Sequence, residues 1–320
     1  MNDSRIVWTG SSALNGEPIA VIAKAGGNGK VSGGRRQVIV LSVVPMTTVE
    51  AIMQPDNMKK TPIQLARVYL DSMKSGDIDA VCHDDCEHKR TRKCYAQFNA
   101  QSVTEPIAMI RAACIDAPVV WKSARDGVDV GKRGKALARM LRDHRFQAGD
   151  RFRLMAVGST GALPVDVAAW LVETFTARGM TALAYVENWR SRPDLRTSHM
   201  ASCYTLDDVA EATAQGWTPF FSPAAEDAGN TLPDDMVLCP ASKMRANIGL
   251  KRTSCASCGL CNGSREDGTT RPGVVSIRHG NGDDTRMRSL VRKGKLGALI
   301  RNNKGKTVGA YRPMLARVSA

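Results

Sequence analysis

Four cysteines near residue 250 constrain the fold of this 320-residue chain more than any other feature. Cys255, Cys258 and Cys261 are separated by two residues each, and Cys239, which is followed by proline, lies fifteen residues before them. A compact three-cysteine run with a remote Cys-Pro is typical of [4Fe–4S] proteins, although four thiolates also make a closed zinc site. We therefore expect one inorganic centre on these residues, with iron–sulfur favoured over zinc and over four unrelated buried thiols.

A second cysteine group lies earlier in the chain, at Cys82, Cys86 and Cys94. The residues between them are strongly polar, so something must hold this stretch in place. Three thiolates alone would leave one iron of a [4Fe–4S] cluster open to a small molecule, whereas a histidine, His83 or His88, would complete a closed zinc site. Both alternatives stay open, as does a third in which these thiols bind nothing.

The two remaining cysteines are isolated in the sequence, and the N-terminus indicates a reducing compartment. Cys114 and Cys203 lie alone in apolar surroundings and are expected to be core residues. The first residues, MNDSRIVWTG, contain no basic stretch followed by an apolar one, so no secretory signal is expected. The longest apolar run, 38–46, is far shorter than the roughly 20 residues of a membrane-spanning helix. We therefore expect a cytoplasmic protein without disulfides and with no membrane partner.

The net charge of +14 is concentrated near the C-terminal end. Residues 278–320 hold eleven Lys or Arg and two Asp, a local charge of +9. Clustered cations neutralise phosphates and release their counterions, which gives salt-sensitive binding to nucleic acid without sequence preference. The tail is thus expected either to bind nucleic acid or to be a solvated basic segment, since no motif of a sequence-reading DNA binder is visible.

The second half of the chain has the pattern of an α/β fold. From Arg151 onward, short apolar runs alternate with amphipathic segments, as in parallel strands joined by covering helices. Strands are predicted at 37–44, 151–157, 181–186, 199–203, 217–221 and 236–238, and helices at 62–76, 106–114, 164–178 and 205–215. The last helix begins with a capping box, Thr205 to Asp208.

This pattern predicts an incomplete barrel-like parallel sheet with cysteine-rich metal loops. We expect an irregular basic N-terminal segment with a strand over 1–60, an α/β core carrying two cysteine-ligated centres over 61–265, and a basic extension over 266–320.

A glycine-bounded turn follows the strand predicted at 151–157, and consists of Gly158, Ser159, Thr160 and Gly161. Its amides and hydroxyls can bind an anion at a helix N-terminus, or it can be a plain connection. In parallel α/β folds, loops at the carboxyl ends of strands line the binding crevice. Residues 187–189 (Glu-Asn-Trp) are therefore candidate pocket residues, and Trp189 is expected mainly to pack.

Several pieces of the sequence together resemble the phage and plasmid "gene product eighty-eight" proteins. They are Cys82 with Cys86, Cys94-Tyr95-Ala96, MAVGSTG at 155–161, MASCYTLDDVAEATAQGWTPFF at 200–221 and CPAS…CASCGLCNG at 239–263. The resemblance implies a protein of a mobile element, which places it in the host-cell cytoplasm, and it says more about architecture than about activity.

The arrangement also resembles radical S-adenosylmethionine enzymes, which have a partial α/β barrel and an early three-cysteine loop. That resemblance implies that Cys82, Cys86 and Cys94 carry a [4Fe–4S] cluster whose fourth iron chelates S-adenosylmethionine, with Tyr95 as the neighbouring aromatic residue. The four later cysteines would hold an auxiliary cluster. The gap before Cys94 is seven residues where two are usual, and Tyr95 follows the cysteine where the aromatic residue usually precedes it. The turn Gly158 to Gly161 lacks the acid that usually holds the methionine amino group.

Three functions are consistent with these patterns. The first is an iron–sulfur protein, radical-SAM-like, that acts on or near nucleic acid. The second is a non-catalytic, zinc-stabilised protein that binds nucleic acid, and the third is a host-interaction factor of a mobile element. The sequence shows no catalytic triad or acid/base pair that would separate an enzyme from a binding protein.

Overall fold

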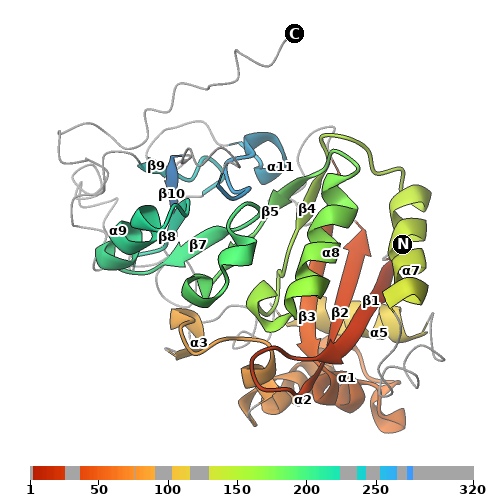
Figure 1. Cartoon of the computed structure of the whole chain (residues 1–320). Helices are drawn as coiled ribbons and strands as arrows, with labels where there is room; N and C mark the ends of the chain where they lie inside the picture. The colour runs from red at the N-terminus through yellow and green to blue at the C-terminus, as the bar shows by residue number, and fades with distance from the viewer. Residues whose placement is uncertain are drawn as a thin grey trace, which may run out of the picture.

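The described residues fold into a mixed α/β structure with two five-stranded sheets (Figure 1). This computed structural model describes residues 3–25, 37–75, 77–90, 103–115, 130–223, 236–242, 253–264 and 272–276. The first sheet has the order β1 (Ser4–Ser11), β2 (Pro18–Ala25), β3 (Val38–Pro45), β4 (Arg151–Arg153) and β5 (Thr181–Leu183). The second has the order β6 (Tyr185–Val186), β7 (Met200–Cys203), β8 (Pro219–Phe221), β10 (Gly273–Val275) and β9 (Met236–Leu238).

The strands from β3 onward pair in parallel, as the alternating sequence pattern predicts. In the first sheet β1, β2 and β3 are antiparallel, and β3, β4 and β5 are parallel. Every pair in the second sheet is parallel. The expectation of an irregular segment with one strand over 1–60 needs correcting, because that segment supplies three paired strands. Apolar runs lie on either side of its basic, glycine-rich stretch at 24–36, and they form β2 and β3.

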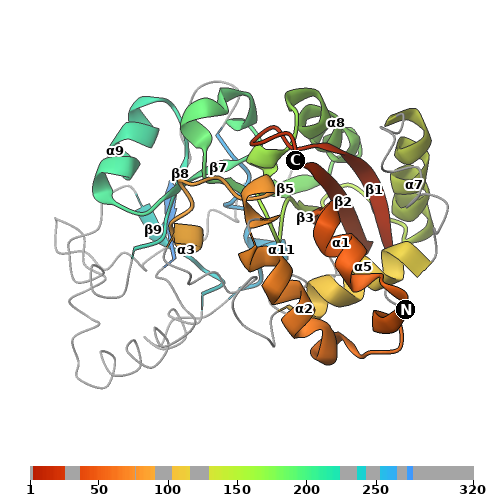
Figure 2. The same ribbon diagram turned by 90° about the horizontal axis from the view of Figure 1, so that it is seen from below.

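The helices cover the first sheet on both sides (Figure 2). On one side lie α1 (Met46–Ile52), α2 (Pro62–Lys74) and α5 (Thr104–Ile115), and on the other α7 (Val130–Asp143) and α8 (Val165–Thr176). The stacked rings of Phe152 and Phe175, 4.6 Å apart, join β4 to α8. Helix α9 (Leu206–Ala214) begins at the predicted capping box, with the Asp208 amide donating to Thr205 Oγ1. None of the described helices is long and apolar enough to span a bilayer.

The two sheets meet within the strand predicted at 181–186. This stretch divides at Ala184 into β5 and β6, because the Ala184 amide donates to the carbonyl of Cys261 and not to a neighbouring strand. The strand predicted at 151–157 is regular only to Arg153, and Met155 adopts a φ of 52°. Both departures lie at the carboxyl ends of the parallel strands, where loops gather to form the site.

Candidate metal centre and the adjoining turn

Two separate segments carry the four later cysteines to one place. Cys239 directly follows β9, and its amide donates to the carbonyl of Val275 on β10 at 2.7 Å. Cys255 and Cys258 bound the one-turn helix α11 (Cys255–Cys258), and the loop after it leads to Cys261. Ser254 caps this helix through its hydroxyl. The carbonyl of Cys261 is fixed by Ala184 at 3.2 Å, at the junction of the sheets.

The four thiols lie near one another and near the Tyr185 hydroxyl. Burial, and next the negative charge of a Cys239 thiolate, raise the pKa of Cys261, and Cys258 and Cys255 act in the same direction. The Tyr185 hydroxyl donates a hydrogen bond to the Cys261 sulfur, which opposes this rise. Cys239 and Cys255 also pack in one side-chain cluster with Cys261 and Tyr185, so three of the four thiols that the spacing selects share one neighbourhood.

These four sulfurs are suitable metal ligands by their chemistry, but they are not arranged around a common point as the ligands of a bound metal would be. In the part of the chain that is described, no three His, Cys, Asp or Glu side chains are arranged to hold a metal ion, and no cysteine forms a disulfide. Cys261 is 9% exposed, and the other three thiols are partly buried. Four soft thiolates from two segments are the donors that zinc and iron–sulfur clusters prefer, so the residues present fit such a group.

A buried arginine adjoins the cysteine loop. Arg151, at the start of β4, is 7% exposed. Gly259, between Cys258 and Cys261, has a φ of 67°, and a methyl group on it would lie 2.7 Å from Nη2 of Arg151. The guanidinium thus lies against the loop, where it can offset thiolate charge. The sequence analysis missed Arg151 and Tyr185, although an arginine opening an otherwise buried strand is itself a signal.

The earlier cysteine group is only partly described. Cys82 and Cys86 are both 8% exposed and follow the short helix η2 (Asp77–Ala80). Lys89 holds this polar stretch, because its ammonium donates to the Cys82 carbonyl and pairs with Asp79 and Asp84.

The other predicted ligands of this group are not all placed. Cys94 and Tyr95 lie outside the described residues, as does the tail 278–320. His83 accepts the Asp85 amide at Nδ1, and its ring is one-third exposed. The side chain of His88 is not among those described.

The turn Gly158 to Gly161 adjoins this group and uses its own polar atoms. Ser159 donates its amide to the Val81 carbonyl at 2.8 Å, and its hydroxyl accepts the Gly161 amide at 3.2 Å. Gly158 packs on Val43 and Val81. Residues Thr160–Ala162 then form the short helix η4. Two of the amides that a bound anion would need are thus taken within the fold.

Two buried basic residues fasten the same turn to the second sheet. Nη1 of Arg192 donates to the carbonyls of Gly161 at 3.0 Å and Leu163 at 2.8 Å. His199 is fully buried, with Nε2 2.9 Å from the Thr160 hydroxyl. Burial, helped by the positive charge of Arg192, lowers the pKa of His199 to about 3. His199 is therefore a hydrogen-bonded structural residue.

Two polar side chains beside the turn each have a buried oxygen atom that receives no hydrogen bond from the described residues. The Glu187 carboxyl follows β6 and contacts the Ser159 hydroxyl, and burial raises its pKa. Its Oε2 and the Oδ1 of Asn188 are buried, and neither has a hydrogen-bond partner among the residues described. A Cβ on Gly161 would lie 1.8 Å from Asn188 Oδ1, so only glycine fits there. Two unsatisfied buried acceptors are costly unless a donor reaches them.

The other candidates belong to the core. Trp189 is 1% exposed, lies edge-on to Trp217 and donates from Nε1 to the Ser202 carbonyl at 3.2 Å. It packs, as expected. Cys114 and Cys203 are buried, and burial raises the pKa of the Cys114 thiol to about 12.

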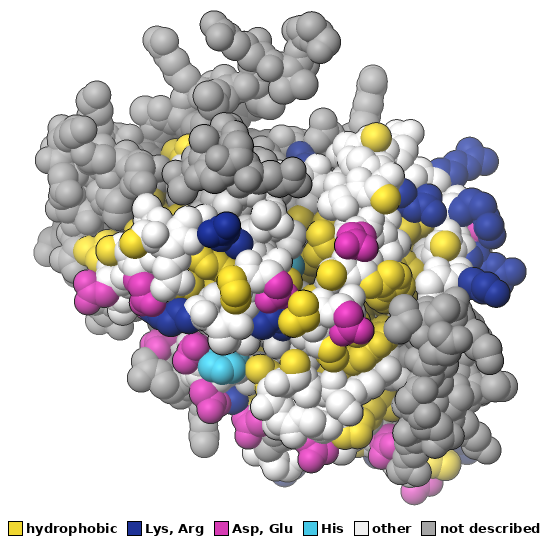
Figure 3. Space-filling model, viewed as in Figure 1, with side chains coloured by type: hydrophobic (Ala, Val, Ile, Leu, Met, Phe, Trp, Pro, Cys, Tyr) yellow, Lys and Arg dark blue, Asp and Glu magenta, His cyan; other side chains and the backbone are white. Residues whose placement is uncertain are grey.

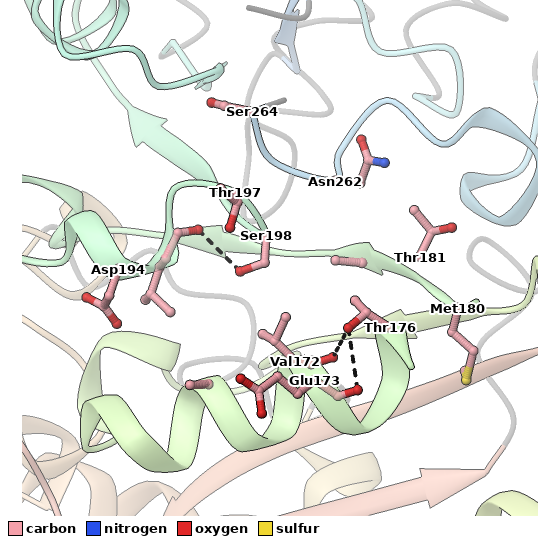
Figure 4. A pocket seen from close by; sticks show the side chains of 13 residues that line it. Val172, Glu173, Thr176, Met180, Thr181, Asp194, Thr197, Ser198, Asn262 and Ser264 are labelled. Atoms are coloured by element: carbon pink, nitrogen blue, oxygen red, sulfur yellow. Dashed lines mark hydrogen bonds between the residues drawn. The ribbon is translucent and has the colours of Figure 1, made fainter. Parts of the chain in front are cut away.

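A groove of about 800 Å³ opens beside the centre, between α8, β5 and the segment that precedes β7 (Figure 4). Asn262, which follows Cys261, lines it, and its Oδ1 is buried with no partner in the described residues. The remaining polar lining consists of carboxylates and hydroxyls: Glu173, Thr176, Thr181, Asp194, Thr197, Ser198 and Ser264.

Comparison of the chain with protein-family models, with curated proteins and with solved structures gives no match.

Proposed function

We propose that this chain is a metal protein in which Cys239, Cys255, Cys258 and Cys261 hold one centre, an iron–sulfur cluster with zinc as the alternative. The observation that supports the proposal is that Cys239 and Cys255, from two separate segments, pack in the same side-chain cluster as the buried Cys261. Isolated structural cysteines do not gather at ligand spacing. An iron–sulfur cluster would supply one-electron chemistry at this position, whereas zinc would act as a structural staple.

The surroundings of the thiols support a charged centre. Four thiolates around either metal leave a net negative charge, which is costly in a buried position without compensation. Two groups of the chain can compensate this charge: the Arg151 guanidinium, which lies against Gly259, and the Tyr185 hydroxyl, which lies at Cys261. Groups of this kind orient and stabilise metal ligands in other proteins.

Anaerobic purification of the full chain tests this proposal. We expect bound metal at one centre or more per chain, with a brown colour and iron if the centre is iron–sulfur. Cys258→Ser should remove metal, whereas Cys203→Ser, at a buried cysteine away from the group, should not. A wild-type protein without metal, or a Cys258→Ser variant with the full complement, would refute the assignment. A colourless protein with zinc alone would select the structural alternative.

A second candidate function rests on the unsatisfied acceptors at the turn. We propose that S-adenosylmethionine binds beside Cys82 and Cys86, in a radical-SAM-like enzyme on an incomplete barrel. The turn Gly158 to Gly161 contains no acid, but Glu187, which directly follows β6, brings a carboxyl to Ser159. Glu187 Oε2 and Asn188 Oδ1 can each accept from a cationic N–H group.

Calorimetric titration of the metal-loaded chain with S-adenosylmethionine tests this candidate. Binding is expected, and Glu187→Gln should weaken it at least about tenfold because the charge-assisted hydrogen bond is lost. Glu173→Gln, at the exposed end of the groove, is the matched control and should bind like wild type. Absence of binding to the wild-type chain would remove this function and leave the metal assignment standing.

A further inference from the structure

An exposed row of cations follows one face of α7. Lys135, Arg139 and Arg142 are spaced four and three residues apart, which places them on one side of a helix, and Arg145 follows at its end. All four are exposed. Figure 3 shows dark blue side chains gathered at the edge of the molecule where Figure 1 places α7. We call these four residues the α7 basic face.

The charge of this face is almost uncompensated. Of its four cations, only Arg142 has a carboxylate within ion-pair distance among the described residues, Asp143 at 3.4 Å. Arg178, which follows α8, is also exposed, and the segments that follow α7 and α8 are joined by the Gly149 amide, which donates to the Gly179 carbonyl at 2.9 Å. Arg190, in contrast, contacts both Asp208 and Glu211.

The opposite face of α7 is buried in the hydrophobic core. Leu137, Met140 and Leu141 are 0% exposed and pack in the core. Over its described side chains, from residue 134 onward, the helix therefore has no free apolar face with which to enter a lipid headgroup region, as interfacial helices do. What it presents is a row of cations that spans about 10 Å from Lys135 to Arg142 at the rise of an α-helix, with Arg145 just beyond the helix end. Duplex nucleic acid offers one phosphate charge per roughly 1.7 Å of axis, so several phosphates lie within reach of such a row.

We propose that the α7 basic face is a nucleic-acid-binding surface that contacts the phosphate backbone without reading sequence. This surface is distinct from the basic tail 278–320 and does not depend on a metal centre. Phosphate contacts of this kind give affinity that falls steeply with salt and is similar for unrelated sequences.

Fluorescence anisotropy with labelled DNA and RNA duplexes of arbitrary sequence, measured on the full chain from about 50 to about 300 mM KCl, tests the proposal. The test variant is Lys135→Gln/Arg139→Gln/Arg142→Gln. The control, Lys59→Gln/Arg67→Gln/Lys74→Gln, removes the same charge from exposed residues on and beside α2, on the other side of the first sheet (Figure 2). Thermal unfolding confirms that both variants remain folded.

We expect the α7 variant to lose about tenfold or more in affinity and to flatten the slope of log K against log salt by about 2–3. The α2 control should change much less. Equal losses in both variants would mean that net charge alone matters, and an unchanged α7 variant would leave the tail as the only contact. Either result overturns the proposal, as does a wild-type chain that binds anionic phospholipid vesicles but not nucleic acid.

Discussion

The buried imidazole of His199 makes stability depend on pH in a way that can be measured. His199 is 0% exposed, and its pKa is lowered to about 3 from an ordinary value of 6.5, mainly by burial. Between these values the folded chain keeps the ring neutral while the unfolded chain protonates it. Since the unfolded state then binds more protons, the free energy of unfolding falls as the pH falls, and above pH 6.5 the effect vanishes.

The size of this effect follows from the shift. Each pH unit between the two pKa values is worth about 1.4 kcal/mol, so the full interval from 6.5 to about 3 amounts to about 5 kcal/mol. From pH 6.5 to pH 4.5 the expected share is about 3 kcal/mol. His199→Gln removes the titrating group and keeps a side chain that can bond to the Thr160 hydroxyl.

Urea unfolding followed by the fluorescence of the buried Trp189 and Trp217 gives the free energy at each pH. Carboxylates titrate in both proteins, so the difference between wild type and His199→Gln isolates the imidazole. The wild type should lose about 3 kcal/mol more than the variant between pH 6.5 and 4.5. Parallel curves for the two proteins would show that His199 is not buried as a neutral ring, and the reasoning about this turn would fail.

Three further predictions concern the site. Arg192→Met should lower the free energy of unfolding by about 3–5 kcal/mol, because it leaves buried carbonyls of the turn without a donor; urea unfolding measures this, and a loss below about 1 kcal/mol would contradict it. Relative to Glu187→Gln, the wild type should lose stability as the pH rises from 4.5 through the raised pKa of Glu187, because only the wild type carries the buried carboxyl that resists ionisation; unfolding curves from acid to neutral pH give the difference between the two proteins, and a difference that does not change with pH would rule it out. Arg151→Gln should release metal to a chelator about tenfold faster than wild type, with Arg178→Gln as the unchanged control, and equal release rates would argue against charge compensation.

Local sequence signals located most of the regular elements. The capping box at Thr205 and the helix that begins at Pro62 are set by residues within one turn, so the pattern is sufficient to predict them. The split of the strand at Ala184 could not be predicted, because it depends on the carbonyl of Cys261, far along the chain. The pairing of β1 with β2 likewise depends on a sheet that only the folded chain assembles.

The candidate site divides in the same way. Spacing selects the four later cysteines as candidate ligands, since ligand spacing is a local property of the chain, and that assignment remains a prediction. Arg151 and Tyr185 lie on strands of different sheets, and only the tertiary fold brings them against the cysteine loop. The prediction that the turn Gly158 to Gly161 binds a cofactor remains a prediction, although most of its polar atoms now have partners within the fold.

X-ray absorption at the edge of the bound metal, on the anaerobically purified full chain, tests the central claim most directly. Four sulfur scatterers at about 2.3 Å are expected, and Cys239→Ser should replace or remove one of them, because this residue comes from a separate segment. A first shell dominated by nitrogen or oxygen, or one that is the same in wild type and Cys239→Ser, would contradict the account.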